Sequence, residues 1–182
     1  MKRIFIIFVW VTLFSLTGCS GLPSYNTYTP PENSLFLIEF DYPADWNWDV
    51  NAKGHVIAFN PNGEGDFGVF VYEKETLNEI TNEMNEDLQA RFLYGADRDA
   101  YIIFDPVAID DHQAKHITLN LPANPRQRHE NARIQETYYL VVGNRLHIIR
   151  LNIEKDQRHS AFGRSFDHVI ETIRVIEESS AP

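Results

Sequence analysis

The 182-residue chain contains a single cysteine, Cys19. An intrachain disulfide is therefore impossible, and no second cysteine is available as a nucleophile. Basic residues are also scarce, since 16 Lys and Arg stand against 26 Asp and Glu, for a formal net charge of −10. Such an acidic surface repels nucleic acid and anionic headgroups, so we expect no nucleic-acid partner. Internal repeats and a serine nucleophile elbow are likewise missing.

Long hydrophobic runs are missing too, except at the N-terminus. Lys2 and Arg3 precede a nearly continuous apolar stretch at 4–16, which is the layout of a secretory signal. The stretch is too short to span a bilayer, which needs about 20 apolar residues. It ends in LTGC at residues 16–19, which resembles the bacterial lipoprotein signal, where the cysteine is acylated and becomes the first residue of the mature chain. We therefore expect a signal peptide at 1–18 and lipidation of Cys19.

Acylation would explain the lone thiol of an exported domain, and two or more acyl chains would anchor it stably. Loss of the signal removes Lys2 and Arg3, leaving 14 basic and 26 acidic residues, a net charge of −12. We expect the protein in the cell envelope, anchored on the extracytoplasmic side. In a host with two membranes, Ser20 after the cysteine favours the outer one under the lipoprotein sorting rule. An ordinary secretory signal or an uncleaved anchor is the alternative.

The segment after the anchor differs in composition from the rest of the chain. Residues 20–34 are rich in Ser, Asn, Thr and Pro and show no hydrophobic periodicity. We predict that residues 19–34 form an acylated, flexible tether with a reach of roughly 20 Å. The remainder suffices for one hydrophobic core, so we expect one globular domain at 35–178 and a tail at 179–182.

Hydrophobic periodicity predicts the elements of this domain. Strands are expected at 35–41, 46–50, 55–60, 67–72, 100–109, 114–121, 134–142 and 145–153, and amphipathic helices at 77–93 and 157–174. Gly143-Asn144 predicts a two-residue hairpin turn, which places Tyr138 opposite Ile149 and Leu140 opposite His147. This order of elements indicates an α+β fold with a largely antiparallel sheet.

Two stretches resemble a known family. The sequence FDYPADW at 40–46 resembles the opening motif of the PsbP-like proteins, a tyrosine-proline pair followed by tryptophan. Tyr138-Tyr139 leading into 145–151, and then Ser165-Phe166, resembles their closing hairpin and helix. The family includes the extrinsic subunit of oxygen-evolving photosystem II and many bacterial lipoproteins of unassigned role, DcrB-like ones among them. The resemblance implies an α/β/α sandwich around a central antiparallel sheet and a non-enzymatic accessory character.

Histidines are the main candidates for catalysis. His112 and His116 are four residues apart, but His116 falls in a predicted strand, where four residues span roughly 13 Å, too far for one metal ion. His147 shares a predicted sheet face with apolar neighbours, so we interpret it as a core or boundary residue. We therefore expect no enzymatic activity.

A calcium site is the candidate for a cofactor. Asn60, Asn62, Glu64 and Asp66 alternate along an oxygen-rich loop, and Ca²⁺ is held by several such ligands. The loop lacks the Asp at its first position and the Glu at its twelfth that the twelve-residue calcium loop requires. A turn between two strands explains the same residues. We expect no other cofactor.

Two further groups are candidates for binding. Trp46 and Trp48 could form an aromatic platform for a ligand, although core packing is an alternative. Arg126, Arg128, His129 and Arg133 form a local basic cluster in an acidic protein and are the candidate partner-binding surface, with an ordinary solvated loop as the alternative.

These observations favour a lipid-anchored, non-enzymatic interaction or assembly factor for an envelope protein complex. The alternative is a lipoprotein module that binds a small ligand or a cation. A hydrolase would require a polar pocket converging on His147.

Overall fold

The computed structural model describes residues 23–32, 34–50, 56–59, 65–73, 101–103, 106–121, 123 and 131–176. The first half of this part contains β1 (Tyr25–Tyr28), β2 (Ile38–Pro43), β3 (Asn47–Val50), β4 (Val56–Phe59), β5 (Gly65–Glu73), β6 (Tyr101–Ile103) and β7 (Val107–Ile109). The second half contains β8 (His112–Leu121), β9 (Arg133–Val142), β10 (Arg145–Glu154), the 3-10 turn η2 (Lys155–Gln157), α2 (Ala161–Thr172) and β11 (Arg174–Val175).

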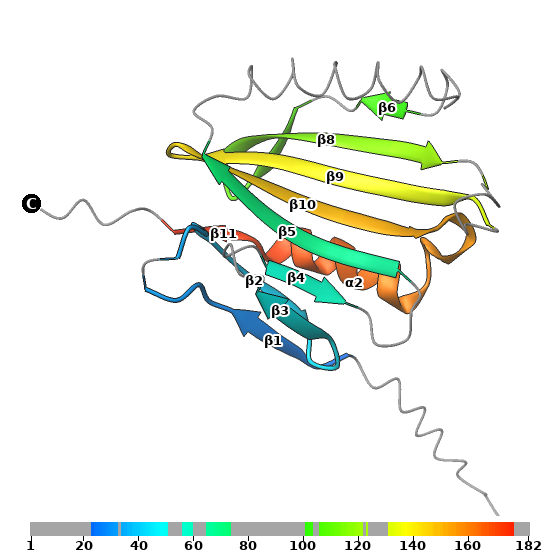
Figure 1. Ribbon diagram of the computed structural model, residues 1–182, viewed down its shortest axis with the longest axis horizontal. Helices are drawn as coiled ribbons and strands as arrows, with labels where there is room; N and C mark the ends of the chain where they lie inside the picture. Colours follow the sequence, from blue (N-terminus) through cyan, green and yellow to red (C-terminus); the bar gives the residue numbers. More distant parts are fainter. Residues whose placement is uncertain are drawn as a thin grey trace, which may run out of the picture.

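The described strands form two antiparallel sheets (Figure 1). The large sheet has the order β3-β4-β5-β10-β9-β8-β6, with β7 also paired to β8. The small sheet has the order β1-β2-β11. Antiparallel sheets combined with a helix make the fold α+β, which confirms the predicted class.

The hairpin of β9 and β10 forms the centre of the large sheet. Tyr138 lies opposite Ile149 and Leu140 lies opposite His147, so the predicted register is confirmed. Gly143 has φ +59°, the positive value that a hairpin turn with glycine at its first central position requires. Local sequence chemistry therefore determines the longest pairing in the sheet.

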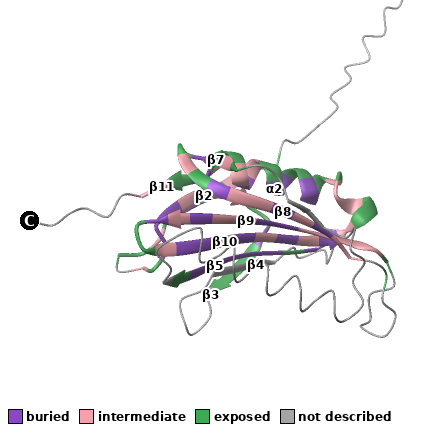
Figure 2. Ribbon diagram, turned by 90° about the horizontal axis from the view of Figure 1, so that it is seen from above, coloured by how far each residue is buried: buried purple, intermediate pink, exposed green. Residues whose placement is uncertain are grey.

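One side of the large sheet is covered by α2 and the small sheet (Figure 2). Ser160 caps α2 by accepting a hydrogen bond from the Gly163 amide at 3.4 Å. α2 and β11 both contribute side chains to the hydrophobic core. Its fully buried members include Phe166 and Val169 of α2 and Ile149 and Leu151 of β10. Burial of each such side chain contributes about 1.5–3 kcal/mol, so this interface stabilises the fold.

The opposite face of the large sheet carries a second apolar cluster. Ile117 and Leu119 of β8 and Leu146 of β10 are buried in it, with further apolar residues packed around them. Both faces of the sheet are therefore apolar, as the centre of a layered sandwich requires. The helix predicted at 77–93 lies outside the described residues.

The predicted tether is too long. β1 pairs with β2 in the register Tyr25 to Pro43 and Tyr28 to Phe40. Tyr28 is buried, with its ring stacked 5.2 Å from that of Phe40. The four residues YNTY have no hydrophobic run that would predict a strand. The strand is held by aromatic contacts and backbone pairing. The fold therefore begins by Tyr25 and not at Leu35.

Two other boundaries differ from the prediction. The strand expected at 100–109 is two strands, β6 and β7, and the linker expected at 110–113 is a two-residue turn. Asp110 and Asp111 take positive φ values of 46° and 63°, which aspartate tolerates better than most residues. The helix expected from 157 begins at Ala161, because Ser160 supplies the N-cap after η2.

Candidate functional site

The two candidate platform tryptophans have different environments. Trp46 is buried, with its ring 5.4 Å from that of Phe67 and 5.0 Å from that of Phe162. Its amide donates to the Pro43 carbonyl, which closes the turn between β2 and β3. Trp48, on β3, is 42% exposed. The predicted two-tryptophan platform is therefore wrong, since Trp46 is a core residue and only Trp48 reaches the surface.

The exposed indole of Trp48 is held in place by two tyrosines. Its Nε1–H donates to the hydroxyl of Tyr42 at 2.8 Å. The indole also packs edge-on against the rings of Tyr28, at 5.4 Å, and Tyr42, at 6.4 Å. Burial raises the pKa of Tyr28, opposed by its hydrogen bond with Ser34. We call Tyr28, Tyr42 and Trp48 the aromatic patch; it connects β3 of the large sheet to the small sheet.

Arg133 of the predicted basic cluster and Asp66 of the predicted calcium loop lie next to each other in the structure. Arg133 donates from Nε to Oδ1 of Asn152 at 2.9 Å and from Nη2 to the Asn152 carbonyl at 3.1 Å. Its Nη2 also lies 3.8 Å from Oδ2 of Asp66. Arg133 is therefore engaged within its own sheet, and Asp66 lies on β5 beside a cation that disfavours a metal ion.

Most residues of the predicted calcium loop and of the basic cluster lie outside the described residues. This applies to Asn60, Asn62 and Glu64 of the calcium candidate and to Arg126, Arg128 and His129 of the basic cluster. Within the part of the chain that the structure describes, no group of three or more His, Cys, Asp or Glu side chains is placed to hold a metal ion. Calcium binding and partner binding by these residues stay predictions.

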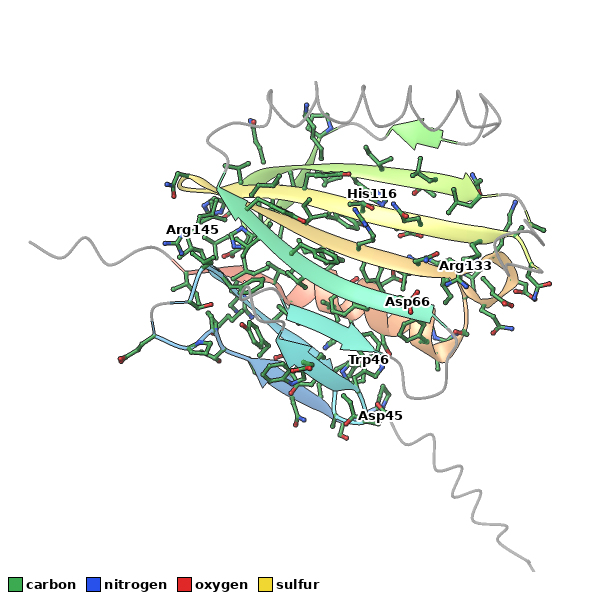
Figure 3. All side chains as sticks on the ribbon, viewed as in Figure 1. Asp45, Trp46, Asp66, His116, Arg133 and Arg145 are labelled. Carbon is green, nitrogen blue, oxygen red and sulfur yellow. The ribbon has the colours of Figure 1, made fainter. Side chains whose placement is uncertain are left out.

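The segment that contains the basic cluster starts after β8 and ends at β9. Both of these strand ends lie at the end of the large sheet where β5 begins and where the β2–β3 turn is found. Asp45, Asp66 and Arg133 mark this end in Figure 3, and Arg145 marks the opposite end. Asn131 secures the return of the chain by donating to Glu154 Oε2 at 2.9 Å.

An ionic cluster connects β9 to the start of α2, with Glu136 buried and Asp167 exposed, and the sequence did not reveal it. Arg158 donates from Nε and Nη2 to the carboxylate of Glu136 and from Nη2 to Oδ1 of Asp167 at 2.6 Å. A further bond runs from Nη1 to the Gly163 carbonyl at 2.9 Å. Burial acts to lower the pKa of Arg158, but its bonds to Glu136 and Asp167 outweigh burial and raise it. Glu136, Arg158 and Asp167 are three charges that satisfy one another.

Two rings extend this ionic cluster along the sheet. His116 stacks on Tyr138 with centroids 4.1 Å apart, and its Nε2 lies 3.8 Å from Oε2 of Glu136. Burial lowers the pKa of His116; Glu136 opposes this shift and Arg158 adds to it. Burial, reinforced by Glu136 and Asp167, raises the pKa of Tyr138 to about 12. Burial therefore favours the neutral form of both rings.

His147 has a structural role, as its pattern predicts. The side chain is fully buried, and its Nε2 accepts a hydrogen bond from the amide of Leu37 at 3.0 Å. Burial lowers its pKa to about 4, and the charge of Arg145 contributes; the nearby Leu140 and Arg145 carbonyls oppose the shift. Arg145 itself donates to the carbonyls of Ser34 and Leu35. These long-range bonds hold the segment before β2 on β10.

No helix in the described ranges has the length and apolar character needed to cross a membrane.

No protein-family model and no curated protein matches the chain. It is similar in structure to CyanoP, the cyanobacterial PsbP of Synechocystis sp. PCC 6803, at 16% identity and a TM-score of 0.53, over 87% of this chain and 96% of that one. A second similar structure is LpqN of Mycobacterium tuberculosis, which is involved in cell envelope biogenesis, at 10% identity and a TM-score of 0.51, over 76% of this chain and 83% of that one.

A third similar structure comes from Bacteroides thetaiotaomicron, at 15% identity and a TM-score of 0.54. The match covers 86% of this chain but only 50% of that protein's length. At such identities a structural likeness shows the fold alone. The chain therefore has a PsbP-like fold, in agreement with the resemblance of its motifs.

Proposed function

We propose that the protein is a lipid-anchored, non-enzymatic interaction factor on the extracytoplasmic side of a membrane, acting within an envelope protein complex. The observation that carries this proposal is the position of Cys19. It ends a signal-like apolar run and lies six positions before Tyr25, the first residue of β1. A cysteine at this point would attach the folded domain directly to the bilayer once acylated.

The fold supports an envelope role. LpqN, which shares the fold, is involved in cell envelope biogenesis. CyanoP shares the fold and is a PsbP protein. A common fold does not transfer function by itself, so LpqN adds support only because the N-terminal signal also points to the cell envelope.

The polar chemistry of the described residues favours an interaction role over catalysis. The carboxylates of Glu136 and Asp167 are bound by Arg158, and the imidazole of His147 is bound by the amide of Leu37. Groups held in this way stabilise the protein and are poorly placed to transfer protons to a substrate.

The strand ends that flank the segment of the basic cluster suggest where a partner binds. Its segment leaves β8 and enters β9 at the end of the molecule where β1 begins. With Cys19 in the membrane, a partner bound there would lie close to the bilayer. We therefore infer a membrane-embedded or membrane-associated envelope protein with an acidic contact surface.

Replacement of the anchoring residue tests the proposal. In the Cys19→Ser variant, the protein should move from the membrane fraction to the soluble extracytoplasmic fraction, because no acyl chain holds it. Fractionation measures the location of the protein, and the intact mass of the purified protein measures its acylation. Wild-type protein should carry the added mass of its acyl chains. An unchanged membrane fraction for the variant would contradict the lipid anchor. Ser20→Ala is the matched control and should leave both results unchanged.

A further inference from the structure

The chain that connects the proposed anchor to the fold is short. The amide of Ala44 donates to the carbonyl of Ser24 at 2.8 Å, so the chain is already fixed to the β2–β3 turn there. Fully extended chain covers at most about 3.6 Å per residue, so Cys19 lies within about 22 Å of Tyr25. An acylated Cys19 therefore keeps the β2–β3 turn close to the membrane surface.

The aromatic patch lies beside this turn. Tyr42 pairs with Asn26, one position from the pairing of Tyr25 with Pro43. Trp48, in the second position of β3, is bonded to Tyr42. The anchoring segment and the exposed indole therefore leave the fold at the same place.

Among the described residues, the other large exposed apolar side chains are far from the start of β1. They are Leu35 and Tyr72, which are 41% and 44% exposed. Tyr72 pairs with Leu146, near the β9–β10 turn at the opposite end of the large sheet, and Leu35 is bound there by Arg145. Trp48 is thus the large apolar side chain that a membrane near the anchor would meet.

The chemistry of Trp48 suits a membrane interface. Its one polar group, Nε1–H, is already bonded to Tyr42, so the exposed part of the ring is apolar. Tryptophan and tyrosine are enriched where hydrocarbon meets headgroups, because their rings are partly apolar and partly polar. The packing of Trp48 on Tyr28 and Tyr42 means that little side-chain freedom is lost on insertion.

We propose that Trp48 inserts into the headgroup region beside the acylated Cys19 and fixes the orientation of the domain on the membrane. The inference rests on the lipid anchor proposed above. Asp41 and Asp49 adjoin Tyr42 and Trp48 in the sequence, and Asp45 lies in the β2–β3 turn, so the negative charge of this region favours zwitterionic over anionic headgroups. Membrane and anchor then hold one end of the large sheet, and the end with Arg145 points away from the bilayer (Figure 3).

Tryptophan fluorescence tests the insertion. The mature chain from Cys19 keeps two of the three tryptophans, Trp46 and Trp48. Acylated protein is reconstituted into phosphatidylcholine vesicles in which part of the lipid carries bromine on the acyl chain near the headgroup, because bromine quenches indole emission on contact. Trp46 is buried and shielded, so the expected loss of emission comes from Trp48. The loss should become smaller when phosphatidylglycerol replaces much of the unbrominated lipid.

Two variants make the result specific. Trp48→Phe preserves a ring for packing and should abolish the bromine-dependent loss of emission. Tyr72→Ala removes a similarly exposed ring at the other end of the sheet and should leave the loss unchanged. Circular dichroism verifies that both variants are folded.

Flotation separates the two proposals. Protein that does not float with the vesicles contradicts the lipid anchor, and the insertion of Trp48 falls with it. Protein that floats but shows equal emission in brominated and ordinary lipid overturns the insertion alone. That second result would indicate that Trp48 faces the aqueous side, where a glycan or a protein partner would meet it.

Discussion

At the scale of single residues, His147 shows how a polar side chain can be essential to an apolar core. Its neutral imidazole accepts the amide hydrogen of Leu37, which would otherwise be buried without a partner. Protonation converts Nε2 from an acceptor to a donor and breaks this bond. The stability of the fold should therefore depend on pH.

The direction of this dependence follows from the pKa values. Burial lowers the pKa of His147 from 6.5 to about 4 in the folded state. Between these two pH values the unfolded chain binds more protons than the folded one. The contribution of His147 to the free energy of unfolding is therefore complete above pH 6.5 and decreases as pH falls toward 4. We expect a loss of up to about 3 kcal/mol in the free energy of unfolding.

Urea titrations of the soluble Cys19→Ser domain at pH 7.5 and pH 4.5 measure this loss. The His147→Gln variant should be less stable at pH 7.5 and should show a smaller change between the two pH values. An equal change in both proteins would assign the pH dependence to other groups. His112→Gln, at a partly exposed position on β8, is the matched control.

At the scale of elements, Arg158 joins a strand to a helix. It contacts Glu136 of β9 and Asp167 of α2, and its backbone lies so close to the helix that position 163 has to be glycine. A Cβ at Gly163 would lie 1.8 Å from the Arg158 carbonyl oxygen. The start of α2 is thus positioned by close contacts with Arg158 and, through Arg158, by Glu136 of β9.

Removal of the guanidinium should be strongly destabilising. In Arg158→Met, the buried carboxylate of Glu136 loses its charge partner, which typically costs about 3–5 kcal/mol. The double variant Glu136→Leu/Arg158→Met removes both charges and should lose less than the sum of the two single losses. Chemical denaturation measures the free energy of unfolding of the two single variants and of the double variant.

The outcome that would contradict this coupling is simple additivity of the two substitutions. Arg164→Met is the matched control, since Arg164 is exposed on the same helix and bonds only locally to the His159 carbonyl among the contacts observed. It should change stability by no more than about 0.5 kcal/mol.

The secondary-structure predictions were correct where they depended on local sequence patterns. The β9–β10 hairpin and its register followed from Gly143-Asn144 and from the alternation on either side. β1 was missed because its pairing with β2 and the packing of Tyr28 come from residues beyond the strand. The break between β6 and β7 was missed because both pair with different parts of β8.

At the scale of the whole molecule, the start of β1, the aromatic patch and the strand ends that flank the segment of the basic cluster lie at one end. Partner binding by the basic cluster is testable by mild crosslinking and affinity purification from the native membrane. We expect a reproducible partner that is lost in the Arg126→Glu/Arg128→Glu variant, because reversed charge repels an acidic surface.

A matched variant, Arg164→Glu/Arg174→Glu, makes the same change in charge at exposed positions on α2 and β11 and should retain the partner. Loss of the partner in both variants would assign binding to net charge and not to the basic cluster. Recovery of the wild-type protein alone, from membranes whose other complexes stay intact, would contradict the interaction role.

The sequence by itself determined the α+β class, the central hairpin with its register and the core or boundary position of His147, because alternation and turn chemistry are local properties. Only the tertiary structure decided that Trp46 is buried while Trp48 is exposed, that Arg133 is bound by Asp66 and Asn152, and that Arg158 is enclosed by two carboxylates. Each of these depends on residues brought together by strand pairing and helix packing. No pattern along the chain specifies which distant side chain will meet which.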